Sequence, residues 1–333
     1  ISLDRQSRNW QTQGERQMAT TTQTAINTGK AAKKAAYTNR AEVTKFALDC
    51  MESYEKNGQI PVIPKGWARL QTNGRRSDWA AAYDHLTQFW NGTLSDTVKT
   101  VFVLDGNAKL PFVAFSTLPL LTCPGKGACA VWCYSLKAWR NPHAFMRQLI
   151  NTLRLLTVAG RNQIVKAWHS LPQGAIVRLY VDGDIDSKRT MAFWFQLLIA
   201  RSDIRCYGYS KSWEIFLDWN DSGRPFPDNY ILNLSGGSKY GSDTLAKMAE
   251  LPIVRGEFLA VDTELSMPKG RTSADIKNAP TWGEYSRQAR AAAANMGMGK
   301  VWVCPGRCGD CMGNGEHACG NPNITIPVII AVH

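Results

Sequence analysis

Between residues 100 and 237, short β-rich runs alternate with longer helical segments, and this alternation limits the fold more than any other feature of the chain. The β-rich runs are TVFVLD at 100–105, AIVRLYVDGD at 175–184, IRCYGYSKS at 204–212 and NYILNLSGG at 229–237. Helices are predicted between them at 141–160 and 188–202; Pro142 suits a first turn and Gly160 a helix end. Strands separated by helices pair in parallel, so we expect an α/β fold with a partial or complete parallel β/α barrel.

Three regions are predicted along the 333 residues. Residues 1–60 form a basic helical extension, which ends where two prolines interrupt the pattern. Residues 61–300 hold the β/α region, and residues 301–333 hold a cysteine-rich knuckle with a closing strand. Met18 is a more natural start than Ile1, so we expect residues 1–17 to be a non-native upstream extension.

The formal charge of +12 suggests a polyanionic partner, and the basic residues are unevenly placed. No Asp or Glu occurs from Gly106 to Val181. In that stretch an arginine recurs every seventh residue from Arg140 to Arg161, which predicts a continuous cationic stripe on a helix. The residues expected to contact nucleic acid, DNA in preference to RNA, are Lys126, Lys137, Arg140, Arg147 and Arg154. Packing of the arginine stems is the alternative.

The chain has no run of about 18 apolar residues and no apolar core of a secretory signal near Ile1. We therefore expect no membrane association and a cytoplasmic location. Thiols stay reduced in that compartment, so metal binding is a better use of the nine cysteines than disulfide bonds.

The first cysteine group has the spacing Cys123-x5-Cys129-x3-Cys133, in a segment whose proline and glycines allow a tight loop. Clustered thiolates are typical ligands of iron–sulfur clusters and of zinc. Three thiolates would leave one iron of a [4Fe–4S] cluster open to a substrate. The alternatives are buried core cysteines, or a zinc site completed by His143.

The second group contains four cysteines among glycines: Cys304, Cys308, Cys311 and Cys319. This segment has almost nothing else to bury, so a hydrophobic role is a poor explanation and a metal site is the stronger one. It also contains His317. Zinc and a second iron–sulfur cluster both fit these ligands. We expect Cys50 and Cys206 to be ordinary buried residues.

Candidate catalytic residues follow two predicted strands. Asp182, Asp184 and Asp186 alternate, so an extended backbone would point all three to one side of a strand end, where β/α proteins place their sites. Helix capping explains Asp186 better. Lys211 ends the next strand and could contact a phosphate or carboxylate, so Asp182, Asp184 and Lys211 are the candidates.

The stretches CPGKGACAVWCYSLKAW, VRLYVDGDIDS and CYGYSKS, with the C-terminal knuckle, resemble the gene product 88 family of phage and mobile-element proteins over about residues 100–320. That resemblance implies a gene carried by a phage or mobile element in a bacterial host. It implies no established activity. The order of these segments along the chain is also similar to that in radical S-adenosylmethionine enzymes. DGDIDS stands where those enzymes have a Gly-Gly-Glu-like turn. Their spacing, Cys-x3-Cys-x2-Cys, differs from that of the first group here and occurs instead at Cys304, Cys308 and Cys311.

These features favour an iron–sulfur enzyme that modifies a nucleic-acid base or nucleotide, with a cluster on Cys123, Cys129 and Cys133. A small cosubstrate, for which S-adenosylmethionine is a candidate, would bind the open iron. One alternative is a zinc-stabilised base-exchange enzyme of the transglycosylase type. Another is a non-enzymatic DNA-binding protein whose metal clusters only hold loops together.

Overall fold

The computed structural model describes residues 40–63, 76–95, 98–104, 111–309, 311–312 and 316–331. Most of the predicted N-terminal extension lies outside these residues, and so does the side chain of Arg140. Within the described part, no helix has the length and apolar character needed to cross a membrane.

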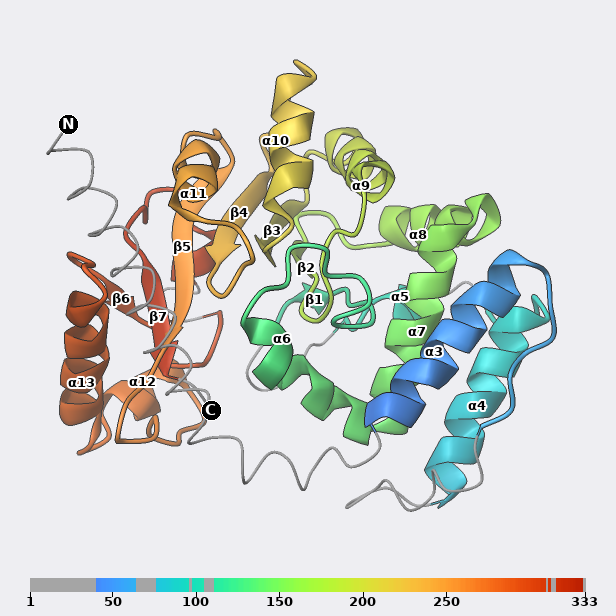
Figure 1. Cartoon of the computed structure of the whole chain (residues 1–333), viewed down its shortest axis with the longest axis horizontal. Helices are drawn as coiled ribbons and strands as arrows, with labels where there is room; N and C mark the ends of the chain where they lie inside the picture. Colours follow the sequence, from blue (N-terminus) through green and yellow to red (C-terminus); the bar gives the residue numbers. More distant parts are fainter. Residues whose placement is uncertain are drawn as a thin grey trace, which may run out of the picture.

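One sheet of seven parallel strands organises the molecule (Figure 1). The strands are β1 (Val113–Ala114), β2 (Ile176–Leu179), β3 (Arg205–Ser210), β4 (Tyr230–Ser235), β5 (Val254–Val261), β6 (Trp302–Val303) and β7 (Val328–Ala331). Their order is β1-β2-β3-β4-β5-β7-β6, which confirms the predicted α/β fold with a parallel sheet. Among the described residues, no strand pairing joins the edge strands β1 and β6 to close a barrel.

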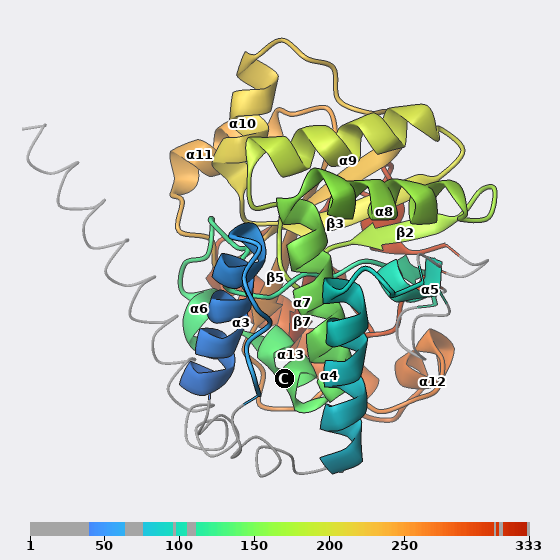
Figure 2. The same cartoon turned by 90° about the vertical axis from the view of Figure 1, so that its right-hand side faces the viewer.

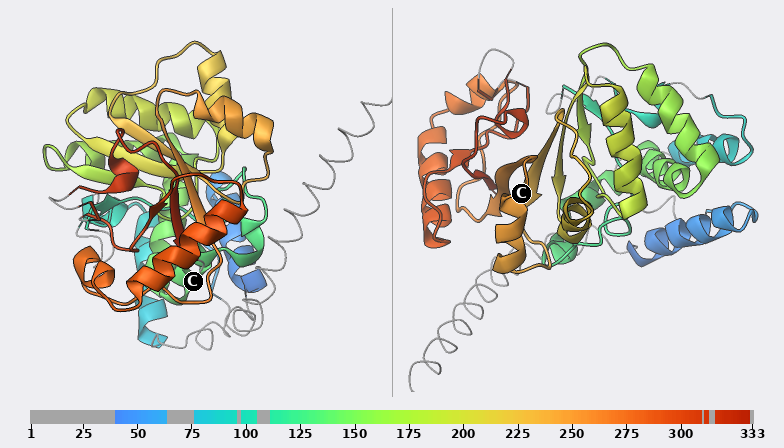
Figure 3. Two further views of the ribbon diagram at one scale, coloured as in Figure 1. Left: turned by 90° about the vertical axis from the view of Figure 1, so that its left-hand side faces the viewer. Right: turned by 90° about the horizontal axis from the view of Figure 1, so that it is seen from above.

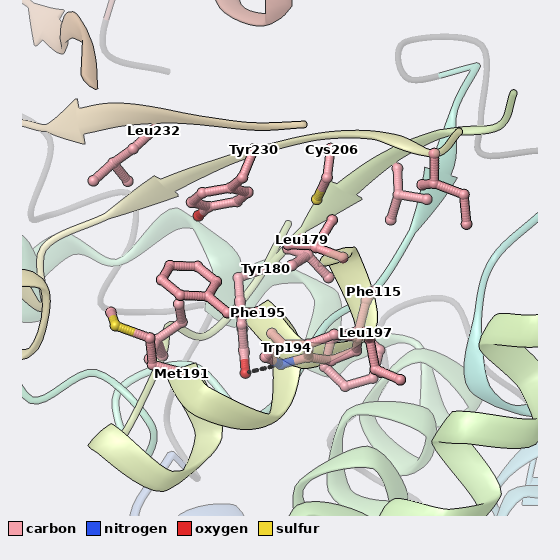
Figure 4. Packing of buried hydrophobic residues seen from close by; sticks show 14 of the residues in the cluster. Phe115, Leu179, Tyr180, Met191, Trp194, Phe195, Leu197, Cys206, Tyr230 and Leu232 are labelled. Carbon is pink, nitrogen blue, oxygen red and sulfur yellow. Dashed lines mark hydrogen bonds between the residues drawn. The ribbon is translucent and has the colours of Figure 1, made fainter. Parts of the chain in front are cut away.

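Four helices cover one face of this sheet, which we call the outer face: α8 (Val158–His169), α9 (Lys188–Ala200), α10 (Trp213–Asp221) and α11 (Ser242–Ala249). Figure 2 shows α8 and α9 above β2 and β3. Large aromatic side chains fill the space between the two layers, and Trp194 donates from its Nε1 to Tyr180 Oη at 2.9 Å (Figure 4). The connections between parallel strands therefore form the outer layer, as crossover units require.

Helix α7 (Pro142–Leu156) packs with α3 (Arg40–Glu55) and α4 (Arg76–Trp90) in a second apolar cluster beside β1 (Figure 1). Its first turn holds Pro142 as predicted, after the cap Asn141. The predicted end at Gly160 is wrong. Thr157 caps α8 instead, because its hydroxyl accepts from Gly160 N at 3.1 Å and starts the new helix.

The first predicted strand, residues 100–105, is also wrong. Helix α5 (Val98–Val101) occupies its start, and Val103 makes only an isolated antiparallel bridge to Ala114. The edge strand is instead β1, which is two residues long. Cys50 and Cys206 are buried as predicted.

The C-terminal part supplies the other end of the sheet. Helix α13 (Trp282–Asn295) packs on β5, β6 and β7 (Figure 3). The remaining short helices are α6 (Cys129–Trp132), α12 (Ser273–Lys277), and the 3-10 helices η2 (Tyr134–Arg140) and η3 (Ala318–Gly320). The predicted strand, knuckle and closing strand at the C-terminus correspond to β6, the cysteine segment and β7.

Candidate functional site

The first cysteine group lies on a loop, residues 123–133, that we call the cysteine loop. It is joined to the segment after β4 by a short antiparallel contact. Gly125 O accepts from Lys239 N at 3.0 Å, and Gly127 N donates to Gly237 O at 3.2 Å. An isolated bridge between Lys126 and Ser238 completes this contact. The loop therefore crosses the carboxyl ends of the strands, where parallel β/α proteins place their sites.

Two glycines make this close approach possible. A Cβ atom on Gly125 would stand 1.5 Å from Lys211 O, and one on Gly127 would stand 2.6 Å from Ser238 O. Both distances are far below any normal contact, so no larger residue fits without moving the backbone. The tight loop expected from these glycines is confirmed, and its partner segment is residues 236–239.

The structure brings the three thiols of the loop together. Each is partly buried, Cys123 interacts electrostatically with Cys133, and Cys133 does so with Cys129. Burial raises the pKa of the Cys123 and Cys133 thiols, although backbone amides of Ser135 and Leu136 that hydrogen-bond Cys133 act in the opposite direction. These amide donors suit a thiolate that a metal has deprotonated.

Neither cysteine group forms a preassembled single-ion site. Among the residues that the structure describes, no three Cys, His, Asp or Glu side chains are grouped so that they could hold one metal ion. The assignment of any metal to these thiols is therefore a proposal to be tested by metal analysis.

The acidic residues after β2 do not point to one side as predicted. Tyr180 and Gly183 have φ angles of 56° and 80°, so the backbone turns sharply where an extended segment was expected. Asp182 faces α7 and accepts from Gln148 Nε2 at 2.9 Å. Asp184 faces β3 and accepts from Lys211 N and Ile185 N, both at 2.8 Å. Burial raises the pKa of both carboxyl groups.

Asp184 and Asp186 have structural partners. The Asp184 carboxylate is 4% exposed and uses both oxygens to accept backbone amides, so it fixes the turn between the ends of β2 and β3. Asp186 accepts from the hydroxyl of Ser187, which caps α9. The capping interpretation made for Asp186 agrees with this geometry, with Ser187 as the capping residue itself.

Lys211 lies at the carboxyl end of β3, partly exposed, with its Nζ 2.5 Å from Ser235 Oγ at the end of β4. It also interacts electrostatically with Cys123 and Asp184. The structure therefore brings Lys211 and the cysteine loop into one site. Asp182 interacts electrostatically with Cys133 of the same loop.

The predicted cationic stripe is wrong at Arg154. This residue is completely buried, and its guanidinium donates to Thr100 O at 2.9 Å and to Gln163 Oε1 at 2.9 Å. The reason is that α7 is covered on nearly all sides by other helices. Arg147 is also partly buried, whereas Lys126 and Lys137 are exposed beside the cysteine loop.

Two exposed apolar residues in the same region were not predicted. Val131, two positions before Cys133, is 55% exposed, and Tyr134, directly after Cys133, is 54% exposed. With Lys126 and Lys137 they form a rim along the cysteine loop, which we call the loop rim. Nothing in the sequence separates them from core residues, because exposure depends on which face of a short helix meets solvent.

The knuckle cysteines lie on the face of the sheet opposite the outer helices, which we call the inner face. Cys311 and Cys319 are buried there in an apolar cluster with Phe112 and Tyr207, and Cys304 and Cys308 pack against it. Burial lowers the pKa of His317 to about 4, and its ring lies between Phe112 and Tyr207, at centroid distances of 4.6 and 4.7 Å.

A cavity of about 400 Å³ opens beside the knuckle. Its lining includes Phe112, Arg271, Arg307 and Cys308. The cavity makes one knuckle cysteine accessible from outside the apolar cluster.

Comparison with known proteins identifies one family. The family model described as "Gene product 88" matches residues 84–256, which include the cysteine loop and strands β1 to β4, with part of β5. No curated protein and no solved structure matches the chain. The match lends no support to the similarity with radical S-adenosylmethionine enzymes.

Proposed function

The chain belongs to the gene product 88 family, a description that states no activity, and we propose from its own residues that it is an iron–sulfur enzyme acting on nucleic acid. The observation that supports this most directly is the position of three partly buried thiols at the carboxyl ends of parallel strands. Asp182 and Lys211 flank them on two sides.

The thiols of Cys123, Cys129 and Cys133 would hold the cluster. Three thiolates supply one ligand fewer than a [4Fe–4S] cluster has irons, so such a cluster would offer one-electron chemistry at an open iron. S-adenosylmethionine remains a candidate cosubstrate at that position. The close contact with residues 236–239 holds the loop in place before any metal binds.

Beside the thiols, Asp182 and Lys211 are the side chains that we propose for proton transfer and for binding an anionic group. The raised pKa of Asp182, caused by burial, brings its carboxyl group closer to the range in which it can hold or release a proton. Lys211 Nζ can bind an anionic group of a substrate, since it hydrogen-bonds the neutral hydroxyl of Ser235. Asp184 keeps Lys211 in position through the backbone amide.

The loop rim supports a nucleic-acid substrate. Lys137 is an exposed cation that suits a phosphate contact, and the exposed ring of Tyr134 suits stacking on a base. Lys126 is also exposed, but its Nζ donates to Leu120 O at 2.6 Å. The ring lies next in sequence to Cys133, so a base stacked there would be close to the proposed cluster.

Metal analysis tests the cluster. The full chain is purified without oxygen, and its iron, sulfide and zinc contents are measured with absorption and electron paramagnetic resonance spectra. Cys129→Ala should remove about one cluster of iron and leave the chain folded, whereas His143→Ala should change nothing. Zinc that falls with either substitution would refute the open cluster.

Binding measurements test the substrate class. Fluorescence anisotropy with single-stranded and double-stranded oligonucleotides of DNA and RNA, repeated at several salt concentrations, gives the affinity and the salt slope. Lys137→Ala should weaken binding and reduce the slope by about one unit, while Tyr134→Ala should weaken binding with the slope unchanged. Lys188→Ala is the matched control, because Lys188 is 71% exposed on α9 and pairs with Asp218. Equal effects of all three substitutions, or none, would refute the proposed surface.

A second candidate function is nucleic-acid binding without catalysis, with the metal centres only holding loops. It is favoured by the hydrogen bonds that already occupy Asp182 and Asp184. It predicts that Asp182→Asn leaves the binding of nucleic acid unchanged. A chemical change in an oligonucleotide that depends on Cys129, detected by mass spectrometry, would exclude it.

A further inference from the structure

The knuckle lies in the interior of the α/β fold. Its four thiols pack against the inner face of the sheet, among the rings of Phe112, Tyr207 and Tyr209. Asn233, in the middle of β4, donates from its Nδ2 to Cys319 O at 2.9 Å. A side chain of the central sheet therefore fixes the position of this metal-ligand segment.

Sulfur atoms of the knuckle already accept hydrogen bonds. Cys304 Sγ accepts from Gly306 N, and Cys311 Sγ accepts from Ala318 N, both at 3.3 Å. Cys319 interacts with the hydroxyl of Tyr209 through a side-chain hydrogen bond. These donors suit the outer lone pairs of metal-bound thiolates.

Additional buried polar atoms around the knuckle have no partner among the described residues. They are Arg178 Nε, Tyr207 Oη, Trp302 Nε1 and His317 Nε2. A buried donor without an acceptor destabilises the folded state, so several in one place indicate that an acceptor belongs there. Arg178 and Tyr207 both interact electrostatically with Cys308, which places them on the knuckle.

A zinc site adds no atoms beyond its four thiolates, so sulfur atoms that already accept hydrogen bonds would be the only acceptors that it offers to these donors. An iron–sulfur cluster brings inorganic sulfides, which accept hydrogen bonds and carry negative charge. We infer that the four knuckle cysteines hold a redox-active iron–sulfur cluster, and that Arg178 and Tyr207 are positioning residues that donate to its sulfides. This inference goes beyond the proposed function and does not depend on the cysteine loop.

The surroundings of Arg178 agree with this assignment. Its guanidinium stacks on the Tyr209 ring at 4.5 Å, which fixes its plane beside the knuckle. Cys308 also lines the cavity that contains Arg271 and Arg307, so further cations face the same thiol. Positive charge on several sides of one thiol group suits an anionic cluster.

The experiment uses the full chain with Cys123, Cys129 and Cys133 all changed to Ala, purified without oxygen, so that only the knuckle can hold a cluster. We expect about four iron atoms and about four sulfides per chain in this variant. Zinc without sulfide, or no metal, would overturn the inference. A failure of the proposed function gives a different result. If the cysteine loop holds no cluster, the triple variant contains as much iron as the wild-type chain.

Redox titration followed by electron paramagnetic resonance tests the positioning residues in the same background. Arg178→Gln removes a positive charge and Tyr207→Phe removes only a hydroxyl, so both should shift the midpoint potential to more negative values, Arg178→Gln by more. The matched control is Arg224→Gln, because Arg224 also stacks on an aromatic ring, Trp219, at 4.9 Å but lies away from the knuckle. If Arg178→Gln does not fold, Tyr207→Phe alone tests the role of these donors. A midpoint potential equal to that of the Arg224→Gln control would overturn that role.

Discussion

The position of the cysteine loop leads to a sharp prediction for Gly125→Ala. The new Cβ would stand 1.5 Å from Lys211 O, 2.2 Å from Lys211 C and 2.8 Å from Ser212 N. All of these neighbours are backbone atoms of a central strand end, so no side chain can rotate away. The loop must therefore move from the strand by at least about 1.5 Å.

A movement of this size breaks the contact with the segment after β4. The hydrogen bonds at risk are Lys239 N to Gly125 O at 3.0 Å, Gly127 N to Gly237 O at 3.2 Å and Ser238 Oγ to Gly125 O at 3.3 Å. At about 1 kcal/mol each, their loss should lower the free energy of unfolding by about 2–4 kcal/mol. For a chain of this size the melting temperature should fall by about 3–6 °C.

Two assays check this prediction without assuming any activity. Scanning fluorimetry gives the melting temperature, and alkylation of metal-free protein followed by mass spectrometry gives the accessibility of Cys129, whose Cβ lies 3.3 Å from the Cβ position of Gly237. Alkylation of Cys129 should become about tenfold faster or more. The control is Gly241→Ala, which has an ordinary φ of −86° and no atom within 4 Å of its Cβ position. Equal melting and alkylation in the two variants would refute the close approach.

Three other substitutions test different parts of the molecule. Arg154→Met should lower the free energy of unfolding in denaturant by about 2–4 kcal/mol, because buried acceptors lose their donor, while the exposed control Arg189→Met should stay within about 0.5 kcal/mol. Burial raises the pKa of Asp182, so the folded state binds a proton more tightly than the unfolded state; stability is then lost as the pH rises from about 4 through the raised pKa. Asp182→Asn should remove this loss. Parallel curves of the free energy of unfolding against pH for the wild-type chain and the variant would contradict the prediction. Changing Cys308 and Cys311 together to Ser should give insoluble or unfolded chain, because the knuckle fills the inner face of the sheet; a soluble variant with normal melting would show that metal binding there adds nothing to folding.

Local pattern predicted the strands β2, β3 and β4 and the helices α7 and α9, because each of these elements is a continuous run with its own period. It did not identify β5 or the helices α10, α11 and α13. It failed at β1, where only Val113 and Ala114 pair with β2 and no apolar run marks the strand. It failed again between α7 and α8, where Thr157 caps a new helix inside a segment that reads as one. Short elements and caps depend on tertiary contacts that local periodicity does not contain.

The candidate site was predictable to the extent that strand ends meet at one edge of a parallel sheet. This rule selected Lys211 as a candidate at the end of β3, and the structure places it in electrostatic contact with Cys123 of the cysteine loop. The contact of the loop with residues 236–239 was not predictable, since its partners are more than 100 positions apart in sequence. The arginine stripe failed for another reason. A seven-residue repeat shows that Arg147 and Arg154 share a helix face, but it does not show whether water or another helix covers that face.

Arg178 connects the two cysteine groups, and its position explains why the C-terminal segment is part of the same structural unit as the sheet. The inner face of a curved parallel sheet has to be filled, and barrels fill it with side chains from the strands. Here the knuckle fills it, and polar groups of the sheet bind the segment that follows: Arg255 donates from Nη1 to Ile324 O at 2.7 Å. Arg178 interacts electrostatically both with Cys308 of the knuckle and with Tyr134, the residue after Cys133. A change of charge at Cys308 would therefore act on a residue that also interacts with the neighbour of the first cysteine group.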